Sequence, residues 1–191
     1  MCDRYDERFG EGTHVCLVFR DETERQRVVA SFVEDGLEHD QRVYYFADSA
    51  TPGDVTRWLA AMDVDLPTDE LSDRFRAQRT AETYHPSGAF VPEEMYNTLW
   101  SMYDTWRKEG FRGARVTGEM SWALQPIAGK ERLMEYEAGV NEVLTTHPVT
   151  AMCQYDANRF SGEMIFQALQ VHPYMIMNGQ LVRNPYYTAA R

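Results

Sequence analysis

Residues 13–47 read THVCLVFRDETERQRVVASFVEDGLEHDQRVYYFA, and this stretch decides the fold. Its first part, Thr13–Phe19, is an apolar run typical of a buried strand. Apolar side chains then recur at helical spacing over residues 28–37, and a second strand is expected at Arg42–Ala47. Two strands joined through a helix pair in parallel. The stretch therefore predicts a parallel sheet covered by helices.

The same alternation of strands and helices continues along the chain. Helices are expected from Pro52, from Pro92, over 133–144 and over Ser161–Val171, and strands at 73–78, Gly113–Thr117 and Val149–Tyr155. Tyr174–Met177 and Leu181–Arg183 flank Asn178-Gly179, which is typical of an antiparallel hairpin. The predicted fold is α/β, with three α/β/α layers and a mainly parallel sheet, in a single domain over residues 1–191. Residues 79–91 are a candidate lid or binding loop.

The composition indicates an acidic globular chain. Its 191 residues include 19 Lys+Arg and 30 Asp+Glu, which gives a formal net charge of -11. The sequence lacks the clustered Lys and Arg with which proteins bind nucleic acids and anionic membranes. No stretch reaches the roughly 20 apolar residues of a membrane span, and the three cysteines form no CxxC pair. We therefore expect a cytoplasmic protein that does not bind nucleic acid or membranes directly.

Parallel sheets bind ligands beyond the carboxyl ends of their strands, so the loops at those ends are searched first. After the first strand, residues 19–25 read FRDETER, with three carboxylates and neither glycine nor lysine. A loop that holds nucleotide phosphates needs glycines for close backbone approach and a lysine for charge. The segment argues against ATP hydrolysis, and no cofactor is predicted.

Six side chains near strand ends or on a helix face are candidates for binding a small molecule: Glu119, Trp122, Glu137, Asn141, Tyr155 and Asp156. Glu137 lies in register with the apolar face of its helix, where an unpaired carboxylate costs roughly several kcal/mol. It must therefore meet an arginine such as Arg115, a hydrogen-bond donor or a ligand. A structural ion pair and a polar pocket wall both remain open for Glu137, as do a core position and a pocket position for Trp122.

Other reactive side chains are interpreted as structural. Cys16 and Cys153 lie in expected strands, where a cysteine usually packs as a small hydrophobe, with a redox role as the alternative. His14 begins a strand, and His172 precedes Pro173 at a helix end. No spacing such as HxH or HExxH occurs. The sequence predicts neither a metal site nor a set of catalytic residues.

Several uncommon motifs follow one another along the chain: His14–Phe19, Gly36-Leu37, Arg42–Phe46, Arg115–Ala123, Tyr136-Glu137 with Asn141, Cys153–Asp156 and His172-Pro173. In this order they resemble the MEDS family of sensory domains, over nearly the whole sequence. The resemblance implies a core similar to the RecA/KaiC-type ATPases with its phosphate loop lost. It also implies a signalling role, in which small organic molecules derived from hydrocarbons are sensed.

Family members are typically attached to DNA-binding or histidine-kinase modules, whereas residues 1–12 and 184–191 are too short for such a module. The leading hypothesis is therefore a stand-alone regulatory module that binds a small organic ligand among the six candidate residues and signals through a protein partner. Ligand binding would alter the 79–91 loop or the C-terminal hairpin. One alternative is an enzyme with Glu119 and Glu137 as an acid/base pair. Another is a scaffold that binds nucleotides without hydrolysis or forms homo-oligomers.

Overall fold

A seven-stranded sheet runs through the computed structural model, which describes residues 9–67, 74–147 and 149–188. The strand order is β3-β2-β4-β5-β1-β6-β7, parallel throughout except that β7 pairs antiparallel with β6. The strands are β1 (His14–Phe19), β2 (Arg42–Ala47), β3 (Phe75–Arg79), β4 (Ala114–Glu119), β5 (Val149–Asp156), β6 (Tyr174–Met177) and β7 (Gln180–Arg183). The predicted mainly parallel sheet with a C-terminal hairpin is confirmed.

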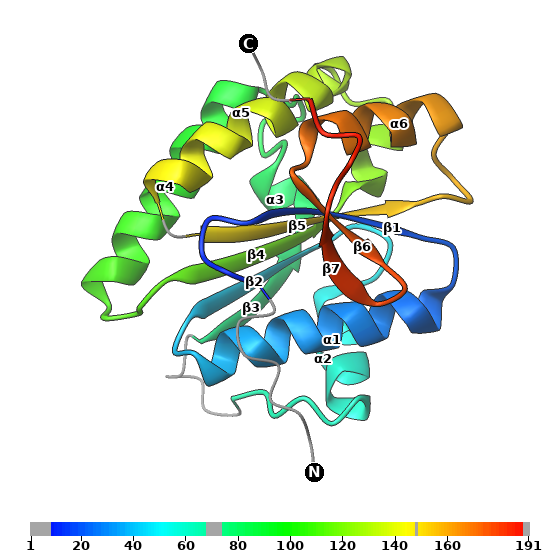
Figure 1. The fold of residues 1–191 in the computed structure, drawn as a ribbon. Helices are drawn as coiled ribbons and strands as arrows, with labels where there is room; N and C mark the ends of the chain where they lie inside the picture. Colours follow the sequence, from blue (N-terminus) through cyan, green and yellow to red (C-terminus); the bar gives the residue numbers. More distant parts are fainter. Residues whose placement is uncertain (1–8, 68–73, 148, 189–191) are drawn as a thin grey trace.

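Helices cover both sides of this sheet (Figure 1). α4 (Pro92–Lys108), α5 (Leu133–Thr146) and α6 (Gly162–Val171) lie on one side, and α1 (Glu22–Glu38) and α2 (Pro52–Ala61) lie on the other. Three short helices complete the described elements: α3 (Thr80–Thr83), η1 (Met120–Leu124) and η2 (Lys130–Arg132). The three-layer arrangement expected from the sequence is therefore present.

Alternation along the central strands sends neighbouring side chains to opposite sides of the sheet. In β5, Cys153 joins the apolar cluster that packs against α4, α5 and α6, while Met152 joins the cluster against α1 and α2. We call these two sides the α5 face and the α1 face. Each face has its own buried core, so a side chain on one face cannot contact a side chain in the core of the other.

Local sequence explains where the helices begin. Only Arg20 and Asp21 connect β1 to α1, and the Asp21 carboxylate caps the helix by accepting a hydrogen bond of 2.7 Å from the backbone N–H of Glu24. At α2, Thr51 and Asp54 form a reciprocal capping box, with Pro52 in the first turn. The starts of α1 and α2 are therefore both capped by a side chain directly before the helix.

Residues 79–91, predicted as a lid or binding loop, are packed against the core, and Tyr84 lines a cavity inside it. Within this segment, Thr80–Thr83 forms α3, and the side chains of Tyr84 and Phe90 are buried. Their rings lie 5.2 and 4.7 Å from the ring of Trp122, measured between centroids. Apolar burial of these aromatic rings ties the segment to the core, so it forms part of the wall of the α5 face.

The hairpin turns as the sequence predicts. Asn178 and Gly179 have φ values of 51° and 71°, which are the left-handed conformations that a two-residue turn between twisted strands requires.

Among the residues that the structure describes, every helix is too short or too polar to cross a bilayer.

Candidate functional site

Four buried side chains from four different elements meet on the α5 face. His14 is the first residue of β1, Glu137 projects from α5, Cys153 lies within β5, and His172 caps the C-terminus of α6. Each residue is 7% exposed or less. One nitrogen, oxygen or sulfur atom of each lies within 4.8 Å of the others. We call these four residues the His–Glu–Cys cluster.

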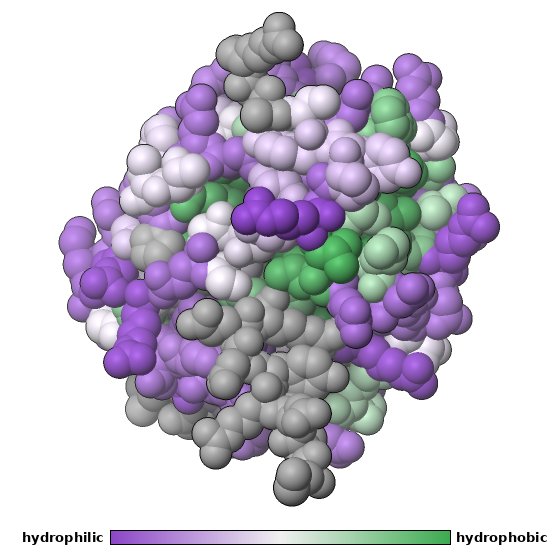
Figure 2. Space-filling model, viewed as in Figure 1, coloured by the Kyte–Doolittle hydropathy of each residue, from purple (hydrophilic) through white to green (hydrophobic). Residues whose placement is uncertain are grey.

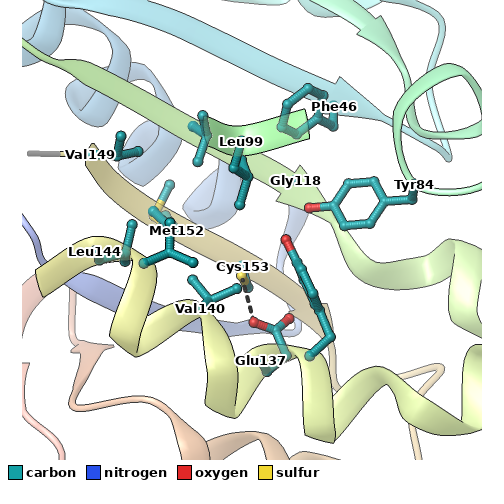
Figure 3. A pocket seen from close by; sticks show the side chains of 14 residues that line it. Phe46, Tyr84, Leu99, Gly118, Glu137, Val140, Leu144, Val149, Met152 and Cys153 are labelled. Atoms are coloured by element: carbon teal, nitrogen blue, oxygen red, sulfur yellow. Dashed lines mark hydrogen bonds between the residues drawn. The ribbon is translucent and has the colours of Figure 1, made fainter. Parts of the chain in front are cut away.

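The carboxylate oxygen Oε2 of Glu137 lies at the centre of this cluster. It is 3.2 Å from Nε2 of His14 and 3.5 Å from Nε2 of His172. The thiol of Cys153 donates a hydrogen bond to it at 3.4 Å (Figure 3). The other oxygen, Oε1, accepts a hydrogen bond of 3.0 Å from the hydroxyl of Tyr155. Both carboxylate oxygens therefore have polar neighbours inside the core.

Hydrogen bonds on the far side of each imidazole ring set the tautomers of the two histidines. The amide nitrogen of Asn141 donates to the carbonyl of Val171 at 2.9 Å, and its oxygen lies 3.1 Å from Nδ1 of His14. Because an amide oxygen only accepts, Nδ1 of His14 carries a proton. Nδ1 of His172 likewise donates to the carbonyl of Ala168 at 2.7 Å. The other ring nitrogen of each histidine, Nε2, points to the centre of the cluster.

Burial sets the protonation of the cluster. Burial and the charge of neighbouring His14 lower the pKa of His172 to about 3, so its ring is neutral near pH 7. Burial alone would raise the pKa of Glu137, but the contacts with His14 and Tyr155 outweigh it and hold that pKa below its usual value. Nε2 of His172 has no hydrogen-bond partner. A lone pair therefore faces a carboxylate oxygen with no proton between them.

A small cavity lies next to the cluster, between the sheet and helix α5 (Figure 3). Its volume is about 20 Å³, and a water molecule needs roughly 10–15 Å³ by the same measure. Glu137 and Cys153 form one wall. The remaining walls are mostly apolar and include Phe46, Leu99, Val116, Val140, Leu144 and Ala151. The cavity is thus a mostly apolar space that is also bordered by one carboxylate, one thiol and the side chains of Tyr84 and Tyr136.

A second, more polar cavity of about 220 Å³ lies at the carboxyl edge of the sheet. Glu119 borders it and accepts hydrogen bonds of 2.6 Å from the hydroxyls of both Tyr45 and Ser49. The guanidinium of Arg25 lies 3.5 Å from this carboxylate and donates to Gln154 at 2.8 Å. Burial and the charge of Glu119 raise the pKa of Tyr45 well above its ordinary value, so its hydroxyl stays protonated. Glu119 is therefore held in a satisfied polar network.

The six residues predicted from the sequence as one ligand site do not surround one pocket. Glu137 belongs to the His–Glu–Cys cluster on the α5 face, where Asn141 hydrogen-bonds to His14 and Tyr155 to Glu137. Glu119 and Asp156 border the edge cavity, where Arg25 enters from α1. Trp122 is fully buried among aromatic rings, as expected if it belongs to the core.

The structure contradicts two further predictions, an acid/base pair of Glu119 with Glu137 and an ion pair of Glu137 with Arg115. Glu119 bonds to Tyr45 in the core of the α1 face, whereas Glu137 bonds to Tyr155 in the core of the α5 face. They do not meet across a cleft, so they form no acid/base pair. The pairing of Glu137 with Arg115 is also wrong, because Arg115 points to the α1 face and forms a buried ion pair with Asp35.

Sequence reasoning missed His14, Cys153 and His172 as partners of Glu137. The search followed the carboxyl ends of strands, whereas this cluster lies at the start of β1, within β5 and at the end of α6. The four residues lie between positions 14 and 172, so no short spacing could reveal them. The one local signal was Glu137 itself, a carboxylate in register with an apolar helix face.

Known proteins resemble this chain in sequence and in fold. The model of the family described as "MEDS: MEthanogen/methylotroph, DcmR Sensory domain" matches residues 13–173. The transcriptional repressor DcmR of Methylorubrum extorquens is 24% identical over 160 residues, which are 83% of this chain and 57% of that protein. The chain therefore spans little more than half the length of this relative.

Solved structures share the fold at low sequence identity. A KaiC-like protein of Pyrococcus horikoshii is 16% identical, with a TM-score of 0.62 over 90% of this chain and 75% of that one. An uncharacterized protein of the same organism, solved with an unknown peptide, is 15% identical, with a TM-score of 0.63 over 94% and 84%. The flagellar accessory protein FlaH of Methanocaldococcus jannaschii is 10% identical, with a TM-score of 0.62 over 94% and 80%. The fold is therefore KaiC/RecA-like.

Proposed function

The chain belongs to the MEDS family of sensory domains, and we propose that it is a regulatory module that binds a small organic molecule in the cavity beside Glu137 and signals to a protein partner. One observation carries the proposal. A mostly apolar cavity inside the α5 face is bordered by a buried carboxylate and a buried thiol. Ligand sites commonly combine apolar walls with a few polar groups that orient the bound molecule.

The cavity limits the size and chemistry of the ligand. About 20 Å³ holds a group little larger than one water molecule, so the ligand has few non-hydrogen atoms or requires the walls to move. The side chains of Leu99, Val140 and Leu144 favour an apolar body. A short hydrocarbon derivative satisfies both conditions, with any polar atom directed towards Glu137 or Cys153.

Nucleotide hydrolysis has no role in this proposal. The β1–α1 connection consists of Arg20 and Asp21 alone, and the Asp21 carboxylate occupies the N-terminus of α1 by accepting from the N–H of Glu24. In a nucleotide-binding loop, that helix end would be open to phosphate and close to a lysine. A carboxylate in this position repels phosphate.

The C-terminal hairpin is the proposed route of the signal. His172 belongs to the cluster that borders the cavity, and β6 begins two residues later, at Tyr174. A shift of Glu137 on ligand binding would therefore act on His172 and then on the hairpin. Apolar side chains gather on the face of the molecule that carries the hairpin (Figure 2), and Met177, the last residue of β6, is 53% exposed. A ligand-dependent change there would be accessible to a partner.

Binding of short organic molecules tests the proposal. We expect members of a panel of one- to six-carbon alkanes, alcohols and halogenated alkanes to raise the melting temperature of the chain. Ala151→Val adds two methyl groups at the cavity wall and should weaken binding of each hit at least about tenfold, which corresponds to about 1.4 kcal/mol. Ala30→Val makes the same change in the core of the α1 face and should leave binding unchanged.

The readouts are thermal shift and isothermal titration calorimetry. The proposal fails if no compound in the panel stabilises the wild-type chain. It also fails if Ala151→Val binds every hit as tightly as Ala30→Val does.

A further inference from the structure

We propose that the His–Glu–Cys cluster binds one zinc ion through Nε2 of His14, Oε2 of Glu137, Sγ of Cys153 and Nε2 of His172. Two imidazole nitrogens, one carboxylate oxygen and one sulfur are ligand types that zinc binds in proteins. All four atoms lie within 4.8 Å of one another. The inference does not depend on the small molecule proposed above and is tested without it.

Four of the six distances between these atoms fit tetrahedral coordination, and the other two, from Nε2 of His172 to Nε2 of His14 and to Sγ of Cys153, are within 4.8 Å. Bonds of about 2.0–2.1 Å to nitrogen and oxygen and about 2.3 Å to sulfur place neighbouring ligand atoms roughly 3.3–3.6 Å apart. Oε2 of Glu137 lies 3.2 Å from His14 Nε2, 3.5 Å from His172 Nε2 and 3.4 Å from Cys153 Sγ. Cys153 Sγ lies 3.6 Å from His14 Nε2. These four distances are within about 0.2 Å of the edges of such a tetrahedron.

The groups behind the ligands also match a metal site. Metal-binding histidines usually donate their second ring N–H to a carbonyl or carboxylate, which leaves the inner nitrogen free to bind the ion. His172 does so through the carbonyl of Ala168 and His14 through the amide oxygen of Asn141. The second oxygen of Glu137 is oriented by the hydroxyl of Tyr155. The atoms that would bind the ion, Nε2 of both histidines and Oε2 of Glu137, therefore all point inward.

Charge gives a separate reason to place a cation here. Nε2 of His172 is buried, has no hydrogen-bond partner, and lies 3.5 Å from a carboxylate oxygen. A buried polar atom without a partner is unfavourable, and a cation at this point would pair with it and with the carboxylate. When zinc binds, the S–H bond of Cys153 is replaced by a Zn–S bond and the proton passes to solvent. The thiolate and the Glu137 carboxylate then balance the two charges of the ion.

The ligand set favours zinc over hard cations. Calcium and magnesium prefer six or more oxygen ligands, and this cluster offers one carboxylate with two nitrogens and one sulfur. Four protein ligands leave no open coordination position, which is typical of a structural site. Such an ion would join β1, α5, β5 and α6 at one point.

The experiment titrates zinc and cobalt into the purified, chelator-treated chain. We expect one equivalent of zinc to bind, to raise the melting temperature, and to release about one proton, because one thiol ionises. Cobalt should produce the visible absorption of tetrahedral Co²⁺ together with a thiolate-to-cobalt charge-transfer band. Cys153→Ser should remove that band. His172→Gln should weaken zinc binding more than about 100-fold, whereas the loss of a group that only hydrogen-bonds to a ligand typically costs about 10–100-fold.

Matched variants separate ligation from general damage. Cys16 faces Cys153 across the β1–β5 pair, is equally inaccessible and is not one of the four clustered residues, so Cys16→Ser should keep the cobalt band. His39→Gln changes an exposed histidine and should bind zinc as wild type does. Asn141→Ala removes the hydrogen bond behind His14, together with the bond to the Val171 carbonyl, but no proposed zinc ligand, and should weaken zinc binding about 10–100-fold. Circular dichroism establishes that each variant is folded.

Two results overturn the proposal. One is a folded wild-type chain that binds no stoichiometric zinc or cobalt. The other is binding that stays within threefold of wild type in folded Cys153→Ser and His172→Gln. If those two variants do not fold, the wild-type cobalt spectrum decides the question, because absence of the thiolate band excludes Cys153 as a ligand.

Discussion

The carbonyl oxygen of His172 accepts a hydrogen bond of 2.8 Å from the side-chain amide of Asn184, the residue that follows β7. The same amide nitrogen donates to the carbonyl of Leu169 in α6 at 2.6 Å. One buried side chain therefore fastens the end of the hairpin to the end of the helix that carries His172 into the cluster. This contact therefore connects the position of His172 in the cluster to the end of the hairpin.

Asn184→Ala should loosen this link. Two carbonyls near the end of α6 lose a donor, which we expect to lower the free energy of unfolding by about 1–3 kcal/mol. Backbone amides of β6 and β7 should exchange with deuterium faster than in the wild type. Gln180→Ala, an exposed change in the same hairpin, is the control and should leave both measurements unchanged. Equal exchange in the two variants would contradict the link.

The buried ion pair of Arg115 and Asp35 should matter far more than an exposed pair. Burial lowers the pKa of Arg115, and the carboxylate of Asp35 partly offsets this effect. Asp35→Ala leaves a guanidinium in the core without its charged partner, so we expect a loss of about 3–5 kcal/mol in urea unfolding.

Arg57 and Asp54 form an exposed pair that serves as the control. Arg57→Met should change stability by at most about 1 kcal/mol, because water screens that pair. If Asp35→Ala costs no more than Arg57→Met, the buried pair does not stabilise the fold as described.

The cysteines of the core should be unreactive in the folded chain. Cys16 and Cys153 are buried, and burial together with the charge of Glu137 raises the pKa of both thiols. In a Cys2→Ser background, used because Cys2 lies outside the described residues, we expect a thiol reagent to label neither cysteine until urea unfolds the chain. Rapid labelling of either thiol under native conditions would instead support the redox role considered from the sequence.

The N-terminus of α2 should show a local dependence on pH. Hydrogen bonds from Thr51, followed by Arg57, lower the pKa of Asp54 to about 2 from an ordinary value of 3.8. Because the folded pKa is the lower one, the ionised carboxylate stabilises the fold above pH 3.8, and this contribution is lost as the pH falls through about 2.

A titration of the Asp54 carboxyl carbon by NMR measures this shift. Thr51→Val should move the Asp54 pKa upward, towards its ordinary value, because it removes the first hydrogen bond. Thr56→Val is the control, since its hydroxyl bonds to the carbonyl of Pro52 and not to Asp54. An Asp54 pKa that does not change in Thr51→Val would show that the capping box is not formed.

Much of the architecture could be predicted from the sequence because its causes are local. The strands at β1, β2 and β5 are continuous apolar runs that differ from the predicted ranges by one residue at most. Asn178-Gly179 specifies a tight turn through backbone conformations that few other residues adopt. The burial of Tyr84 and Phe90 in segment 79–91 could not be predicted. It depends on Trp122, a distant residue that no local pattern connects to them.

The sequence by itself determined the order of the elements, the mainly parallel sheet and the presence of a carboxylate at position 137 in an apolar helix face. Only the tertiary structure decided what that carboxylate meets. His14, Cys153 and His172 reach Glu137 because the parallel crossings bring β1, β5 and the end of α6 under α5. The alternation of side chains along the strands placed Glu119 and Arg115 on the other face. Contacts between residues far apart in the chain depend on the packing of whole elements, so spacing along the sequence does not encode them.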